Sequence, residues 1–107
     1  MATNQDELVW DALGDPTRRA IVLRLSEGPR AVGDLATYLP VSRSAVSQHL
    51  EVLKDAGLVA ERVAGTRRIY RLNEAGVVAL RDQLDTFWNL ALSGYKDLVE
   101  QPLEENS

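Results

Sequence analysis

VGDLATYLPVSRSAVSQHLEVLKDAG, residues 32–57, has the pattern of two short helices joined by a tight turn. We expect the first helix over residues 32–39, a turn at residues 40–41, and a second helix that begins after Ser42 and ends at Gly57. Ser42 suits the N-cap, because its hydroxyl accepts a free backbone N–H of the first turn. Gly57 suits the left-handed position that commonly ends a helix. The stretch therefore predicts a helix-turn-helix.

The second helix of this pair combines an apolar face with a polar face. Its apolar residues recur at helical spacing and are Val46, Leu50 and Leu53, with Ala45, His49, Val52 and Ala56 beside them. The polar face carries Arg43, Ser44, Ser47, Gln48 and Glu51. Such side chains can read the mixed donors and acceptors of a DNA major groove, which a helix-turn-helix enters with this helix. The alternative is an ordinary solvent-exposed face, but that would favour glutamate and lysine, and this one has no acid before Glu51.

Length and composition describe a single domain. The chain has 107 residues, of which 45% are hydrophobic and 26% are charged, as in ordinary globular proteins. It has no cysteine, which excludes disulfides, thiolate metal sites and thiol redox sensing. No apolar run reaches the length of a membrane span and the N-terminus lacks a signal-peptide pattern, so we expect a cytoplasmic protein. We expect one domain over residues 1–100 and a disordered acidic tail over residues 101–107.

The net charge of −4 argues at first against a nucleic-acid partner, but its distribution does not. Residues 30–72 contain seven basic and four acidic residues, a net charge of +3, whereas the rest of the chain carries −7. A basic surface on an acidic body still attracts phosphate.

The segment before the helix-turn-helix predicts two further helices and a very short strand. The first helix should cover residues 6–13. The second should run to about residue 26, with Asp15 as its N-cap and Pro16 as its first residue. Its arginines are expected in solvent or paired with acids rather than on DNA, and they are Arg18, Arg19 and Arg24. The short strand is expected at residues 30–31.

After Gly57 the pattern changes to that of a β-hairpin. Residues 58–64 and 67–72 predict two strands around a turn at Gly65 and Thr66. Three arginines lie beside the tip of this hairpin, and they are Arg62, Arg67 and Arg68. A hairpin in this position is the wing of a winged helix, and its arginines would meet phosphate or the minor groove. The alternative is an exposed hairpin whose charges keep it soluble.

The last predicted helix, residues 74–100 with Asn73 as its N-cap, has an apolar stripe too broad for a small domain to cover. The stripe contains Val77, Leu80, Leu84, Phe87, Ala91 and Leu98, with a second row at Trp88, Leu92, Tyr95 and Val99. The first helix of the chain and the equivalent helix of a second subunit are natural partners, so we expect a homodimer. The interface residues would be Leu8, Trp10, Leu80, Leu84, Phe87, Trp88, Ala91 and Tyr95. Packing wholly within one chain is the alternative.

Three segments of the chain resemble the ArsR family, the arsenic-repressor-type winged-helix regulators of bacteria and archaea. They are ALGDPTRRAIVLRL (residues 12–25), VGDLATYLPVSRSAVSQHLEVLKDAGLV (residues 32–59) and GTRRIYRL (residues 65–72), and the resemblance covers most of residues 6–98. It implies a mainly α winged helix-turn-helix with about five helices and a two-stranded wing. It also implies a homodimer whose first and last helices pair across a two-fold axis. Such a protein would be a repressor, frequently of its own operon, on a pseudo-palindromic promoter operator in double-stranded DNA.

Carried over to this sequence, the resemblance assigns DNA-binding roles to the start of the second helix-turn-helix helix and to the wing. The residues are Arg43, Ser44, Ala45, Ser47 and Gln48 for the major groove, and Arg67 and Arg68, with Arg62 beside them, for the wing. His49 matches the histidine of the family's Ser-x-His-Leu segment. Because His49 lies at the edge of the buried face, a packing or phosphate-capping role is favoured over a base contact.

The sequence departs from the metal-sensing members of the family. Those members carry a cysteine pair in the first helix of the helix-turn-helix, or histidine and carboxylate ligands on the last helix. Here the first position reads Val32-Gly33-Asp34-Leu35, and the last helix offers Asp82 and Asp85 without a histidine. One histidine does not make a metal site, so we expect neither metal sensing nor a cofactor.

Two alternatives to a DNA-binding repressor remain open. A non-metal ligand could bind in the dimer cleft, beside Trp10, Trp88 and Tyr95, and cause release of DNA. The chain could instead be a winged-helix module that binds protein through its long apolar helix, although the polar face with Arg43 and Ser44 argues against this. An enzyme is not expected, because the chain has no cysteine, one histidine, no glycine-rich phosphate loop and no obvious acid–base pair.

Overall fold

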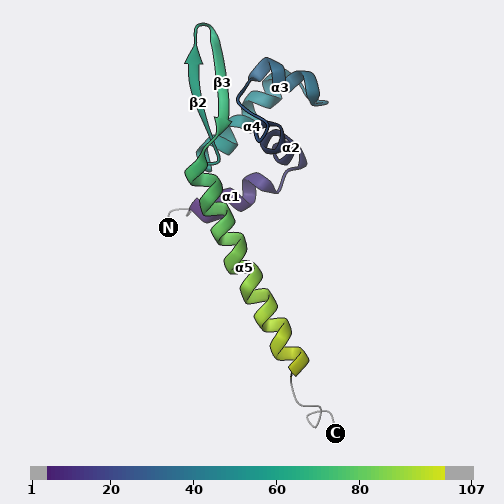
Figure 1. Cartoon of the computed structure of the whole chain (residues 1–107). Coiled ribbons are helices and arrows are strands. Elements are labelled where there is room, and N and C mark those ends of the chain that lie inside the picture. The colour runs from purple at the N-terminus through teal and green to yellow at the C-terminus, as the bar shows by residue number, and fades with distance from the viewer. Residues whose placement is uncertain (1–4, 101–107) are drawn as a thin grey trace.

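The computed structural model describes residues 5–100 and contains five helices and three strands in that part of the chain (Figure 1). Their order is α1 (Gln5–Leu13), α2 (Pro16–Leu25), β1 (Arg30–Ala31), α3 (Val32–Tyr38), α4 (Arg43–Asp55), β2 (Val59–Ala64), β3 (Arg67–Leu72) and α5 (Glu74–Glu100). The predicted winged helix-turn-helix is confirmed, with α3 and α4 as the helix pair and β2 and β3 as the wing. The predicted short strand, β1, adds a third strand to the expected two. The tail expected at residues 101–107 lies outside the described residues.

Capping side chains start two helices where the sequence predicted them. Oδ1 of Asp15 accepts hydrogen bonds from the backbone N–H of Arg18 at 3.1 Å and of Thr17 at 2.8 Å. The bond from Arg18 is the largest cause of a lowered pKa at the Asp15 carboxyl. Oγ of Ser42 accepts from the backbone N–H of Ala45 at 3.0 Å, which fixes the start of α4.

The sheet has the strand order β1-β3-β2, and both pairings are antiparallel. The β2–β3 ladder runs from Val59 opposite Leu72 to Ala64 opposite Arg67. β1 pairs only with residues 69–70 at the inner part of β3, so the hairpin tip extends beyond the third strand. Gly65 closes the tip with a φ of 65°, in the left-handed region that the tight turn needs. The tip arginines are therefore held by a regular two-stranded ladder.

The apolar face of α4 faces the hydrophobic core, as predicted. Val46, Leu50 and Leu53 are fully buried, in one cluster with side chains from α1, α2, α3 and the sheet. Tyr70 of β3 is buried in the same cluster. The core thus fixes the direction in which the opposite, polar face of α4 points.

Two arginines of α2 cap the end of α1. Nε of Arg18 donates to the carbonyl of Ala12, and Nη1 of Arg19 donates to the carbonyl of Leu13, each at 2.7 Å. The last carbonyls of a helix lack partners within the helix and lie at the negative end of its dipole, so cationic donors are favoured there. The expectation of solvent or acidic partners holds for Arg19, which is exposed, and for Arg24, which pairs with Glu27, whereas the half-buried Arg18 instead has backbone carbonyls as its partners.

Helix α5 leaves the body of the domain and continues for 27 residues in all (Figure 1). The protein measures 71 × 29 × 28 Å and has a radius of gyration of 18.8 Å. A compact domain of about 100 residues would have a radius of gyration of about 13 Å. None of the residues of α5 is buried. The alternative that α5 packs wholly within its own chain is therefore wrong.

Candidate nucleic-acid interface

The side chains predicted to read DNA occupy the first two turns of α4. Arg43, Ser44 and Gln48 are exposed, and Ala45 and Ser47 are partly exposed. Each is held in place by the cap at the start of the helix and by the buried face behind it. These turns therefore offer hydrogen-bond donors and acceptors, without an acid, to a partner that approaches from solvent.

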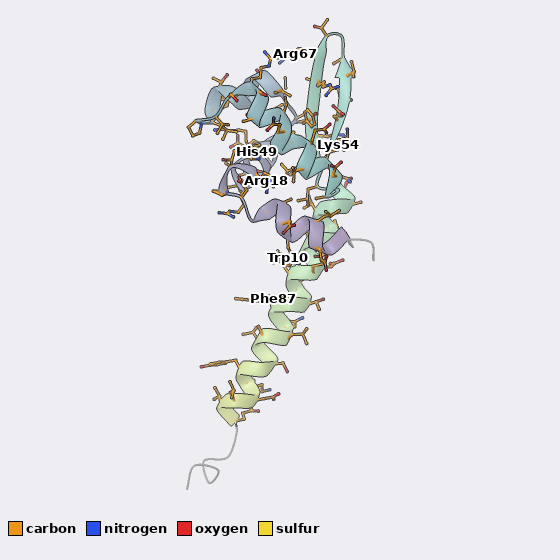
Figure 2. The ribbon with its side chains drawn as sticks, turned by 180° about the vertical axis from the view of Figure 1, so that it is seen from behind. Trp10, Arg18, His49, Lys54, Arg67 and Phe87 are labelled. Atoms are coloured by element: carbon orange, nitrogen blue, oxygen red, sulfur yellow. The ribbon has the colours of Figure 1, made fainter. Side chains whose placement is uncertain are left out.

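A groove of about 450 Å³ lies between the start of α4 and the wing. Its lining residues are Ala31, Val32, Gly33, Arg43, Ser47, Thr66, Arg67 and Arg68. The guanidinium of Arg43 lies over Gly33, since a methyl group at residue 33 would be 3.7 Å from Cζ of Arg43. Arg67 lies between the wing and α3 in Figure 2. The groove thus combines residues predicted to contact bases with residues predicted to contact phosphate.

The three wing arginines have different surroundings. Nη2 of Arg67 lies 3.0 Å from Oδ2 of Asp34 in α3. Nε of Arg68 lies 3.7 Å from Oε2 of Glu61 in β2. Arg62 is exposed on β2 and does not line the groove. The fold therefore brings Arg67 and Arg68, but not Arg62, to the same groove as α4.

His49 contacts α2. Nη1 of Arg18 lies 3.2 Å from Nδ1 of His49, and both residues are labelled in Figure 2. An arginine can only donate, so in this contact Nδ1 of His49 is the acceptor. This contact supports the packing role expected of His49 over a base contact.

A charged network connects the C-terminal end of α4 to the wing. Nζ of Lys54 lies 2.7 Å from Oε1 of Glu61 and 3.5 Å from Oε2 of Glu51. The hydrogen bond between Lys54 and Glu61 lowers the pKa of the Glu61 carboxyl and raises the pKa of the Lys54 ammonium. Burial raises the pKa of the neighbouring Tyr70. Sequence reasoning missed this network, because no helical or strand period relates a helical residue to one on the following strand.

The predicted dimer surface is largely exposed. Its exposed members are Leu84, Phe87, Trp88, Ala91 and Tyr95 on α5 and Trp10 on α1. Phe87 is 54% exposed and Trp88 is 63% exposed, and their rings stack with centroids 6.5 Å apart. Leu8 and Leu80 instead pack partly against the core of their own chain.

Trp10 and one side of α5 form an apolar groove of about 850 Å³, between the two residues labelled Trp10 and Phe87 in Figure 2. The other lining residues are Asp82, Gln83, Leu84, Thr86 and Leu90. Exposed apolar surface of this extent is typical of an association site.

Acidic residues of α5 do not assemble into a metal site. Residues 5–100 contain no group of three or more histidine, cysteine or acidic side chains that could hold a metal ion. Asp82 lies 3.6 Å from the guanidinium of Arg81. In the same part of the chain, no helix is long and apolar enough to cross a membrane.

Comparison with known proteins places this geometry in a family. Residues 15–61 match the model of the arsR family of bacterial regulatory proteins. The HTH-type transcriptional regulator Rv2034 of Mycobacterium tuberculosis is 63% identical over 91 residues, which cover 85% of each chain. This chain belongs to the ArsR family. It is a transcriptional regulator with a winged helix-turn-helix, and the resemblance read from its three sequence segments is confirmed.

Two further relatives extend the comparison. The transcriptional repressor SdpR of Bacillus subtilis is 33% identical over 90 residues, which cover 84% of this chain and 97% of SdpR. The homodimeric winged helix-turn-helix DNA-binding domain Mb0332 of Mycobacterium bovis, a possible ArsR-family regulator, has a solved structure. It matches with a TM-score of 0.67 and 32% identity, covering 84% of this chain and 83% of that one.

Proposed function

We propose that this ArsR-family regulator is a homodimeric repressor that binds operator DNA in promoters, including that of its own operon. The observation that carries the proposal is the groove that joins Arg43 and Ser47 of α4 to Arg67 and Arg68 of the wing. A duplex that received α4 in its major groove would bring its phosphates to the wing arginines. Base contacts would come from Arg43, Ser44 and Gln48 on the exposed face of α4.

The exposed apolar surface of α5 and α1 supports the homodimer. Two-fold association would cover Phe87 and Trp88 with their counterparts and with the first helix of the partner subunit. It would also present two copies of α4 to one duplex, so the operator would be pseudo-palindromic. The homodimeric Mb0332 domain and the repressor SdpR are relatives that favour this assembly and this direction of regulation.

The proposal also covers the extent of the domain, the place where the protein acts and the roles of the other predicted DNA-binding residues. The DNA-binding and dimerisation functions occupy one domain, residues 1–100, and the protein acts in the cytoplasm as a regulator rather than as an enzyme. Arg68 assists Arg67 on phosphate. Arg62 and His49 have secondary roles, because Arg62 lies outside the groove and His49 contacts Arg18.

The test is a mobility-shift and footprinting experiment on the protein's own promoter, with a shuffled duplex of the same length and composition as the control. We expect a specific complex and two protected half-sites about 10–10.5 bp apart, or a multiple of that spacing. Equal affinity for the promoter and the shuffled duplex at every salt concentration would contradict sequence-specific binding to this promoter.

A further inference from the structure

Arg67, one of the two wing arginines that line the groove, is already paired with an acid. Nη2 of Arg67 lies 3.0 Å from Oδ2 of Asp34, in the first turn of α3. The two side chains are 59% and 54% exposed, so solvent reaches both. The residues are 33 positions apart in the chain, and their contact connects the wing to α3 beside the groove. DNA that reaches Arg67 therefore meets a carboxylate at the same guanidinium.

Asp34 and Glu61 each pair with an arginine of the groove, and Asp34 makes the shorter contact. Three of the eight lining residues are arginines and none is acidic. Arg43 packs over Gly33, the neighbour of Asp34 in α3, and Arg67 pairs with Asp34 itself. A phosphate that entered the groove would be attracted by the arginines and repelled by Asp34.

The pair is poorly suited to a bracing role. The β2–β3 ladder already holds Arg67 at its last register position, opposite Ala64. The bond between Lys54 and Glu61 ties the base of the wing to α4. An exposed ion pair adds little rigidity to such a framework, because both side chains lose entropy and water screens their attraction.

We propose that Asp34 is an intramolecular competitor of DNA phosphate for Arg67. This inference rests on the proposed function, since it requires a duplex in the groove. To contact a DNA phosphate, Arg67 must break its ion pair with Asp34 or contact both groups at once. The Asp34 carboxylate then lies beside the negatively charged DNA backbone. Asp34 thereby lowers the sequence-independent part of the affinity and leaves operator occupancy more dependent on the base contacts of α4.

The test is the Asp34→Asn variant, which keeps the side-chain size and removes the charge. We expect affinity for both promoter and random duplex to rise by about two- to five-fold per subunit at low ionic strength, the range of an exposed ion pair. The gain should shrink as salt is added, and the plot of log affinity against log salt should be steeper than for the wild type. Asp34→Ala, which also removes the charge, should show the same direction.

Two controls separate competition from a simple change of net charge. Glu100→Gln makes the same charge change at the far end of α5 and should leave DNA affinity close to wild type (Figure 1). In an Arg67→Ala background, Asp34→Asn should give a smaller gain in DNA affinity. Without Arg67 there is no ion pair to break, so the substitution removes only the repulsion between Asp34 and phosphate. An equal gain in both backgrounds would mean that Asp34 acts without Arg67 and would overturn the competition.

The outcomes also distinguish this inference from the proposed function. A wild type that bound no duplex at any salt concentration would overturn both the proposed function and the inference about Asp34. A wild type that bound DNA, with Asp34→Asn binding equally or more weakly while unfolding at the same temperature, would remove only the inference. Weaker binding would mean that Asp34 is a brace for Arg67 and not its competitor, and equal binding would mean that it has neither role.

Discussion

Gly76 of α5 packs against the carbonyl group of Gly57 so closely that a β-carbon at residue 76 would overlap the carbonyl oxygen. Nδ2 of Asn73 donates to the same oxygen at 2.9 Å, and the backbone N–H of Asn73 donates to the carbonyl of Leu58 at 2.9 Å. These contacts join the first turn of α5 to the turn that ends α4. The direction of α5 is therefore set at a glycine–glycine contact next to the end of α4.

Gly76→Ala should separate α5 from this turn and destabilise the protein. Overpacking against rigid backbone typically costs about 1–3 kcal/mol, and we expect a decrease of that size in the free energy of unfolding measured in urea. Gly94→Ala is the control on the same helix, because no neighbouring atom of its own chain lies within 4 Å of the added β-carbon, provided that sedimentation shows the variant to be as dimeric as the wild type. Alanine is favoured over glycine inside a helix, so the control should gain about 0.5–1 kcal/mol. Equal effects of the two substitutions would contradict the contact with Gly57.

The ion pair between Lys54 and Glu61 should make stability depend on pH at acidic values. The pKa of Glu61 is lowered in the folded state, so its stabilisation is present above the ordinary value of 4.5 and is lost as pH falls through the folded value. The raised pKa of Lys54 preserves its charge until pH exceeds 10.5. Glu61→Gln should therefore lower the thermal midpoint at neutral pH, and the difference from wild type should narrow well below pH 4.5.

The control for this experiment is Glu51→Gln, which removes the longer, more exposed contact to Lys54 at 3.5 Å. It should shift the thermal midpoint less than Glu61→Gln. A difference between wild type and Glu61→Gln that stayed constant from neutral to strongly acidic pH would show that the carboxylate charge is not what stabilises the wing.

Charge placed in the apolar surface of α5 should abolish dimerisation. At micromolar concentration, sedimentation of the wild type should give twice the chain mass, and Phe87→Asp or Leu84→Asp should give a single chain. An uncompensated carboxylate buried in such a seam is strongly unfavourable. Asn89→Asp adds the same charge on the opposite side of the helix and should remain dimeric. A monomeric wild type would end the dimer hypothesis.

Metal ions should not alter operator binding. The chain has no cysteine and one histidine, and residues 5–100 contain no cluster of potential ligands. Operator affinity should be the same with a chelator and with added zinc, once ionic strength is matched. Release of the operator by one divalent ion, and not by others at equal ionic strength, would contradict this expectation.

The sequence predicted most of the fold because the determining signals are local. Asp15 and Ser42 cap helices through atoms two or three residues away, and Gly65 lies at the tip of a hairpin of adjacent strands. The exposed polar face of α4 was predicted for the same reason, since the helical period places Ser44 and Gln48 away from Leu50.

The contacts that connect elements were not predicted. Arg67 meets Asp34 across 33 positions and Arg18 meets His49 across 31, and no periodicity relates such residues. Gly76 did leave a signal, because glycine is unfavourable inside a helix unless a close contact requires it. Locating that contact at Gly57 required the packed structure.

The final prediction separates the roles of α4 and the wing. Base-edge contacts give sequence discrimination, whereas phosphate contacts give affinity and salt dependence. Arg43→Ala or Gln48→Ala should reduce the preference for operator over random DNA by about 1–3 kcal/mol for each bidentate base contact that the substitution removes. Arg67→Ala should weaken binding to both duplexes nearly equally. It should also flatten the plot of log affinity against log salt by about one unit for each phosphate that is no longer neutralised.

A salt titration of operator and random duplex binding measures both quantities at once for these variants. In a two-fold dimer each substitution acts in both subunits, so its effect on one operator doubles. Arg62→Ala is the matched control for Arg67→Ala, because it removes an exposed wing arginine that does not line the groove. It should change affinity and salt dependence less than Arg67→Ala. If Arg67→Ala erased the operator preference while Arg43→Ala and Gln48→Ala preserved it, the wing would read the sequence and α4 would bind the backbone.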